Sequence, residues 1–125
     1  MYMEQMSLAR QVDLVFRQVR DELEHVTSGI VFIQIRNNMV GKFGLRHDPI
    51  NARAGMKIGA SGGLTEEQRI ALRNIALEAL SHKTDWTHGE IQFEFSVRQN
   101  TLIASIQFES HYNMSAIVPS FRNVR

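Results

Sequence analysis

A basic, glycine-rich segment in the middle of this 125-residue chain holds the residue types best suited to bind an anion. A helix is predicted to begin soon after it, and the free backbone N–H groups at a helix N-terminus can bind a negatively charged group. Two glutamates in the first turn of that helix, Glu66 and Glu67, repel such a group, so a solvated loop is the alternative. The candidate anion-binding residues are Arg46, His47, Arg53, Lys57, Gly62 and Gly63.

The same segment contains a serine among glycines. Ser61 lies within Gly-Ala-Ser-Gly-Gly over residues 59–63, which is similar to the Gly-x-Ser-x-Gly elbow of many hydrolases. The elbow requires a helix immediately after the serine, whereas here the predicted helix begins only after Thr65. The spacing also differs from that of a Walker loop, which needs Gly-Lys-Ser or Gly-Lys-Thr. An enzyme with an unrecognised site is therefore only the third alternative for this chain.

Five histidines raise the question of metal binding or acid–base chemistry. His47 and His111 each follow the second strand of a predicted hairpin, so they are candidates to lie near one another. The chain contains no His-x-x-x-His pair, and no third ligand is evident. We therefore expect exposed loop histidines, with no metal site, no catalytic site and no cofactor.

The composition predicts one globular domain over residues 1–125. Hydrophobic residues make up 43% of the chain and charged residues 22%, as in ordinary soluble domains. With no cysteine, disulfides and thiolate chemistry are excluded. No apolar run is long enough to span a membrane, and the first residues lack a signal-peptide pattern, so we expect a cytoplasmic protein with no membrane partner. The net charge is only +1, although basic residues concentrate between Arg36 and Lys57.

Two amphipathic helices are predicted. Over residues 8–26 apolar side chains recur at steps of three and four, with Ser7 as the N-cap and Ser28-Gly29 ending the helix. The second helix runs to about residue 82, and Thr65 with Gln68 matches the capping-box pattern at its start. We expect both helices to pack against a sheet.

Two hairpins are predicted, one after each helix. The first joins residues 30–36 to 39–46 through Asn37-Asn38, and a two-residue turn there pairs Ile30 with Leu45, Phe32 with Phe43, Ile33 with Lys42, and Ile35 with Val40. The second turns at Gln99-Asn100 and pairs Val97 with Leu102, Phe95 with Ala104, Phe93 with Ile106, and Ile91 with Phe108. The order of a helix followed by a hairpin thus occurs twice, and we interpret this echo as an architectural repeat. When the Asn37-Asn38 turn is aligned with the Gln99-Asn100 turn, Val31 matches Phe93.

Two segments lie outside these elements. The connection between Arg46 and Leu64 is longer than most structureless loops, and residues 53–58 are a candidate short third strand within it. The tail, residues 112–125, is too apolar to be a solvated end, so we expect it to dock on its own domain or on a second chain.

The first hairpin is apolar on both faces, and exposed apolar patches usually mark association. Burial in the core is the simpler interpretation of its second face. The alternative is a homodimer formed through sheet faces, sheet edges or exchanged tails. The candidate interface residues are Val31, Ile33, Ile35, Val40, Ile117 and Phe121.

We expect an α+β fold with an antiparallel sheet of four or five strands and two helices on one face. The order helix, strands, helix, strands, tail resembles that of the type III secretion chaperone fold, and this resemblance implies a dimeric binding protein. The chain also resembles small uncharacterised proteins of spore-forming Gram-positive bacteria, which imply no function. The leading hypothesis is a non-enzymatic cytosolic interaction or regulatory protein that acts as a homodimer on an unknown protein partner. The alternative is an anion or nucleic-acid binder that uses residues 46–63.

Overall fold

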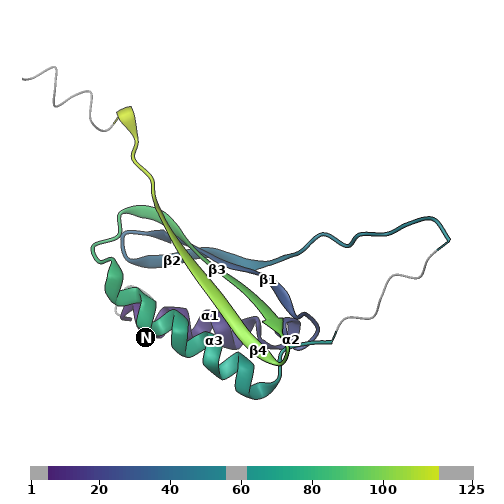
Figure 1. Cartoon of the computed structure of the whole chain (residues 1–125). Helices are drawn as coiled ribbons and strands as arrows, with labels where there is room; N and C mark the ends of the chain where they lie inside the picture. Colours follow the sequence, from purple (N-terminus) through teal and green to yellow (C-terminus); the bar gives the residue numbers. More distant parts are fainter. Residues whose placement is uncertain (1–5, 56–61, 116–125) are drawn as a thin grey trace, which may run out of the picture.

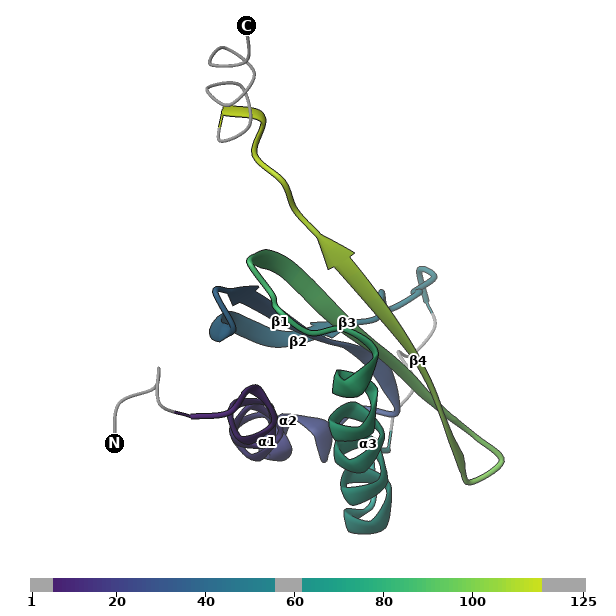
Figure 2. The same ribbon diagram turned by 90° about the vertical axis from the view of Figure 1, so that its left-hand side faces the viewer.

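The computed structural model describes residues 6–55 and 62–115, which form four strands and two main helices. The strands form one antiparallel sheet in the order β2-β1-β3-β4. The longer helices lie side by side on one face, and the described helices leave the other face open (Figure 1, Figure 2). The predicted α+β fold is therefore confirmed. The elements are α1 (Leu8–Gln18), α2 (Arg20–Leu23), β1 (Ser28–Arg36), β2 (Met39–His47), α3 (Glu66–Ala79), the 3-10 turn η2 (Leu80–His82), β3 (His88–Arg98) and β4 (Thr101–Ser110).

The first helical stretch is shorter than predicted. Ser7 caps α1 by accepting a hydrogen bond from the Arg10 N–H, but the helix is interrupted at Val19 (φ −90°, ψ 2°), and α2 ends at Leu23. We expected Ser28 and Gly29 to end this helix, but both residues belong to β1. A Cβ at Gly29 would lie 2.8 Å from the Arg46 carbonyl oxygen, so close strand contact explains this glycine.

The second helix and second hairpin follow the predictions. Thr65 and Gln68 form both hydrogen bonds of the capping box at the start of α3. Gln99 and Asn100 have positive φ angles, and all four predicted pairs between β3 and β4 are present, from Val97–Leu102 to Ile91–Phe108. Local patterns were sufficient here because one strand face is apolar and the other polar.

The first hairpin differs from the predicted register. Asn37 and Asn38 form the turn and Ile35 pairs with Val40, as expected. A bulge between Ile33 and Ile35 then places two β2 residues opposite one β1 residue. The predicted pairs beyond it are therefore wrong by one position, because Ile30 pairs with Arg46, Phe32 with Gly44, and Ile33 with Phe43.

β1 carries apolar side chains on both faces, with Ile30 and Phe32 on the open one, whereas the bulge gathers most apolar side chains of β2 on one face. The bulge turns Phe43 to the same face as Ile33, the face that packs against the helices. Val31, Ile33 and Ile35 are at most 2% exposed, so these three predicted interface residues are core residues and unavailable to a partner. Val40 is half-buried against the same core. Ile117 and Phe121 lie outside the described residues.

The two helix-hairpin units meet at the centre of the sheet. β1 pairs with β3 in antiparallel fashion, and Val31 is directly opposite Phe93, the residue it matches when the two turns are aligned. The sequence echo thus corresponds to an approximate twofold relation between the units. Buried side chains from both units and from the helices form one core cluster.

One polar side chain is buried among these apolar residues. Gln11, 2% exposed on α1, donates a hydrogen bond to the Asn38 carbonyl oxygen (3.2 Å) and accepts one from the Val40 N–H (2.7 Å). The Asn38 side chain in turn accepts from the Trp86 N–H (2.8 Å). The first turn is therefore held by both α1 and the segment that leads into β3.

The predicted third strand is not seen at residues 53–55, and the remainder of that prediction lies outside the described residues. No described helix is long and apolar enough to cross a membrane.

Candidate functional site

The predicted anion-binding residues have separate partners. The Arg46 guanidinium lies over the Phe32 ring, 5.4 Å from its centroid, on the open sheet face. The His47 Nε2 atom is 2.6 Å from a Glu22 carboxylate oxygen, so this ring nitrogen already has a hydrogen-bond partner. Arg53 is exposed in residues 48–55, a segment that extends away from the sheet (Figure 1).

Only one of the two candidate glycines is required by packing. A Cβ at Gly63 would collide with the Glu24 backbone, so glycine is needed where this segment passes the end of α2. Gly62 is exposed and lies near Thr27. Lys57 and Ser61 lie outside the described residues. Within the described part of the chain, some of the candidate residues therefore contact other protein groups: His47 contacts Glu22, and Gly63 passes the Glu24 backbone.

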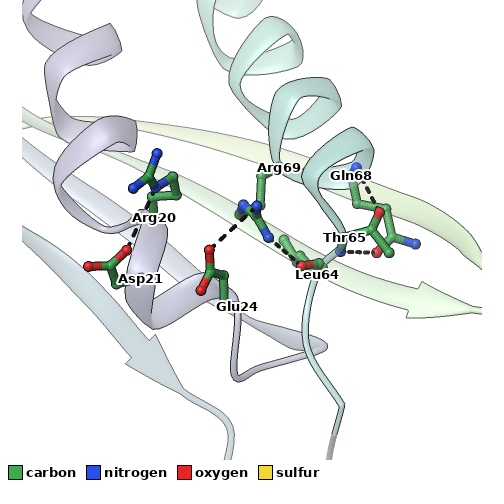
Figure 3. Close-up of polar contacts among 7 residues, drawn as sticks. All are labelled: Arg20, Asp21, Glu24, Leu64, Thr65, Gln68 and Arg69. Carbon is green, nitrogen blue, oxygen red and sulfur yellow. Dashed lines mark hydrogen bonds and ion pairs between the residues drawn. The ribbon is translucent and has the colours of Figure 1, made fainter.

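The N-terminus of α3 is closed by its own side chains. Thr65 and Gln68 satisfy each other's backbone N–H groups through the capping box. Arg69 donates to the Leu64 carbonyl oxygen (2.7 Å) and is 3.5 Å from Glu24, as Figure 3 shows. With Glu66 and Glu67 also in the first turn, this helix end has little capacity for an anion.

An arginine-rich groove of about 470 Å³ lies between α1–α2 and α3. Its guanidinium groups are paired with carboxylates, since Asp13 is 3.0 Å from Arg17 and 3.6 Å from Arg73, and Arg20 is 3.6 Å from Asp21. Figure 3 shows Arg20 and Arg69 on opposite sides of this gap. Asp13 of α1 thus bridges Arg17 of α1 and Arg73 of α3, so the charged residues of this groove hold the two helices together. Its lining residues are Phe16, Arg17, Arg20, Leu23, Glu66, Arg69, Ile70 and Arg73.

The histidines are arranged differently from the prediction. His47 pairs with Gly29 near the start of β1, whereas His111 follows Ser110, which pairs with Gly89 beside the other end of β1. His47 and His111 therefore lie at opposite ends of the sheet. The residue beside His111 is His88, whose carbonyl oxygen accepts a hydrogen bond from the His111 N–H (2.8 Å). Within residues 6–55 and 62–115, no three acidic or histidine side chains form a metal-binding group.

The open sheet face carries separated charges. Strand alternation places basic side chains over β1 and β2 and acidic side chains over β3 and β4, with the exposed Arg98 at the turn end of β3 as the exception. Its half-buried Ile30 and Phe32 lie between these regions. The basic residues are Arg36, Lys42 and Arg46, and the acidic residues are Glu90, Glu94 and Glu109.

The two sheet edges are protected to very different degrees. β2 has a bulge and Lys42, and the Gln11 side chain binds the Val40 N–H on it. Bulges and lysines are features that keep an edge from pairing with another strand. β4 spans ten residues, pairs with β3 without a bulge, and contains Glu109 as its one charged side chain, with no lysine, arginine or proline. Among the described elements, β4 is the edge best suited to accept another strand.

The tail leaves the sheet directly after β4. Figure 1 shows its described part extending past the end of the strand. Tyr112 and Met114 are 82% and 69% exposed, so the described side chains do not dock on their own domain. The apolar character of the tail was visible in the sequence, but the edge beside it was not, because strand order depends on contacts between distant segments.

Comparisons of the chain with known protein families, with curated proteins and with solved structures give no match.

Proposed function

We propose that this protein is a non-enzymatic interaction module that acts as a homodimer, with β4 of one copy pairing in antiparallel fashion with β4 of the second. The observation that carries the proposal is the unprotected ten-residue edge of β4, opposite a β2 edge that has a bulge, a lysine and a buried glutamine bound to it. An exposed edge offers a row of unpaired backbone groups, and strand addition satisfies them. The result is one continuous eight-stranded sheet.

The side chains of β4 favour one register for this pairing. If the twofold axis passes through Ser105, Leu102 lies opposite Phe108 of the second copy, and Ala104 lies opposite Ile106. These are the residues of the helix-covered face, so the apolar layer continues across the interface. Glu109 faces Thr101 of the second copy and avoids its own counterpart. The register therefore pairs apolar with apolar residues and creates no like-charge contact.

The same register accounts for the exposed tail. Ser110 of one copy lies opposite Asn100 of the other, so the residues after Ser110 run beside the Gln99–Asn100 turn of the second copy. Tyr112 and Met114, which are exposed on the single chain, gain a neighbouring surface there. This arrangement supports docking of the tail on a second chain, one of the two options expected from the sequence.

The proposal assigns the dimer to a reducing cytosol, in line with the absence of cysteine. A protein-binding role also agrees with the element order that resembles type III secretion chaperones. The open sheet face remains free in this dimer and is the surface we propose for a further protein partner.

Sedimentation and light scattering at micromolar concentration test the dimer. Ser105→Lys places two ammonium groups opposite each other at the twofold axis, and Ser105 is exposed, so the variant should fold and be monomeric. Gln34→Lys is the matched control, because it adds the same charge on the same open face but on the central strand β1. It should remain dimeric.

Two outcomes would contradict this assignment. A strict monomer at all concentrations would reject the homodimer. A dimer that survives Ser105→Lys but is lost in Gln34→Lys would assign the interface to the open sheet face and reject the β4 edge.

A further inference from the structure

A cavity of about 350 Å³ lies at the end of the sheet where β1 and β2 leave their turn and β3 begins. We call it the sheet-end cavity. It brings together residues of the first hairpin and residues of the second unit, which are far apart in the sequence. Its lining residues are Gln34, Ile35, Arg36, Gly41, Lys42, His88, Gly89 and His111.

The cavity contains positive charge that is not balanced by a carboxylate pair. Unlike the arginines of the helix groove, Arg36 and Lys42 form no ion pair with any carboxylate in the described part of the chain. Arginine offers a planar set of N–H donors suited to phosphate oxygens, and lysine adds a compact charge with three donors. Both side chains are exposed and therefore accessible to a ligand.

Two imidazoles complete the group. Arg36 pairs with His88 across β1 and β3, and His111 is joined to His88 through a backbone hydrogen bond of 2.8 Å. Histidine side chains donate hydrogen bonds from a ring N–H in either charge state. The nearest acidic partner is Glu109, 3.4 Å from His111, while Glu90 is bound by the amides of Gln34 (3.3 Å) and Gln92 (2.7 Å).

A second cavity adjoins this group and shares its two histidines. It has a volume of about 370 Å³ and is lined by His88, His111, Tyr112, Asn113 and Met114. The cationic group therefore continues into a region with an aromatic ring and a thioether. Such a pair of regions suits a ligand with one anionic group and one apolar or aromatic part.

We propose that the sheet-end cavity binds the phosphate group of a small phosphate monoester, with Arg36 and Lys42 as charged contacts and His88 and His111 as further donors. A phosphate carries nearly two negative charges and three strong acceptor oxygens, which four such side chains can satisfy. A carboxylate offers less charge and two oxygens, and so uses fewer of these donors. The organic part of the ligand lies along Tyr112 and Met114.

A nucleic acid is a poorer occupant of this site. An extended phosphate backbone needs a continuous row of basic groups, whereas beyond the cavity the open face mixes Arg46 and Arg98 with the acidic residues of β3 and β4. Glu90, Glu94 and Glu109 would repel the neighbouring phosphates. We therefore keep the hypothesis of anion binding, but we move the site from residues 46–63 to the sheet-end cavity and the ligand from nucleic acid to a phosphate monoester.

Calorimetric titration of the full chain with phenyl phosphate, inorganic phosphate and benzoate tests the proposal. Phenyl phosphate should bind with one site per chain, inorganic phosphate more weakly, and benzoate at least about tenfold more weakly than phenyl phosphate. Arg36→Gln and Lys42→Gln should each weaken phenyl phosphate about tenfold. Glu109→Gln should strengthen it, because it removes the one carboxylate beside His111.

Arg53→Gln is the matched control, since it removes another exposed arginine, from the segment first predicted to bind anions. It should leave the affinity unchanged. Equal losses in Arg36→Gln and Arg53→Gln, or no binding of phenyl phosphate at millimolar concentration, would overturn the site. A single-stranded oligonucleotide that binds more tightly than phenyl phosphate and is released by Arg36→Gln would replace the small ligand with nucleic acid. Ser105→Lys should bind inorganic phosphate as the unchanged chain does, because the four phosphate contacts lie apart from the proposed dimer contacts of β4 and the tail.

Discussion

At the scale of single residues, Gln11 shows how a buried polar side chain can position an edge strand. Its amide both donates to the Asn38 carbonyl and accepts from the Val40 N–H, so two backbone groups of the first hairpin are satisfied by α1. An apolar residue at this place would pack equally well but would leave both groups without a partner. Buried backbone groups without partners destabilise the folded state.

Gln11→Leu should lower the free energy of unfolding by about 1–3 kcal/mol, because the part-buried Asn38 carbonyl and Val40 N–H lose their hydrogen bonds to the side chain. Urea denaturation followed by circular dichroism measures the change. Gln18→Leu, the same substitution at an exposed position of α1, is the control and should change stability by less than about 0.5 kcal/mol. Equal effects of the two substitutions would show that the Gln11 hydrogen bonds do not stabilise the fold.

The sequence did not reveal Gln11, and the reason is physical. In the helical pattern of residues 8–26 it occupies a position beside Val12, and composition alone does not distinguish a polar residue that faces solvent from one that faces a backbone edge. That distinction requires the position of the Asn38 turn, which is 27 residues away along the chain. The Thr65–Gln68 capping box was predictable because both partners lie within one helical turn.

At the scale of elements, the two hairpin turns have the same backbone but different environments. Both have positive φ angles at both central residues, as a type I′ turn requires. The side chain of Asn38 accepts a hydrogen bond from the Trp86 N–H, whereas Asn100 has only a long backbone contact, 3.5 Å from Gln68. The first turn is therefore tied to the rest of the fold and the second is closer to an independent turn.

Asn38→Gly should lower the free energy of unfolding by about 1 kcal/mol, because glycine keeps the turn geometry but leaves the Trp86 N–H without its acceptor. Asn100→Gly should be neutral or slightly stabilising, since type I′ turns favour glycine at their second central residue, where φ is positive. The two variants share the same change in backbone entropy, so the difference between them isolates the hydrogen bond. Thermal denaturation of both, side by side, provides the measurement, and equal midpoints would contradict the role of Asn38.

The hairpins also show where sequence-based register assignment ends. The β3–β4 register was predictable because a one-residue slip would bury glutamates such as Glu94. In β2, Gly41 and Gly44 impose no such penalty, and the bulge at Gly41 and Lys42, opposite Gln34, shifts every later pair. Helix packing buries the predicted interface residues Val31 and Ile33, and the β4 edge is the surface that we propose for association. The strand order, and therefore which strands form the edges, could not be predicted from the sequence, because both depend on the pairing of β1 with β3.

At the scale of the whole molecule, the two helix-hairpin units share one core. Ile33 of the first unit pairs with Ile91 of the second, and both are fully buried. Phe16 of α1 contacts Phe93 of β3 edge to face, with ring centroids 5.7 Å apart. These contacts cross from one unit to the other, so neither unit can bury its apolar face alone. The chain should therefore unfold as a single cooperative body despite its internal echo.

Ile33→Ala tests this cooperativity, because the chain has a single tryptophan, Trp86, which is buried in the second unit beside Phe108. The substitution should lower the free energy of unfolding by about 2–5 kcal/mol through the cavity it leaves in β1. The loss should be equal whether unfolding is followed by Trp86 fluorescence or by far-ultraviolet circular dichroism at one protein concentration. If the fluorescence transition stays in place while the circular dichroism transition moves, the second helix-hairpin unit folds without the first. The two units would then unfold independently despite their shared core.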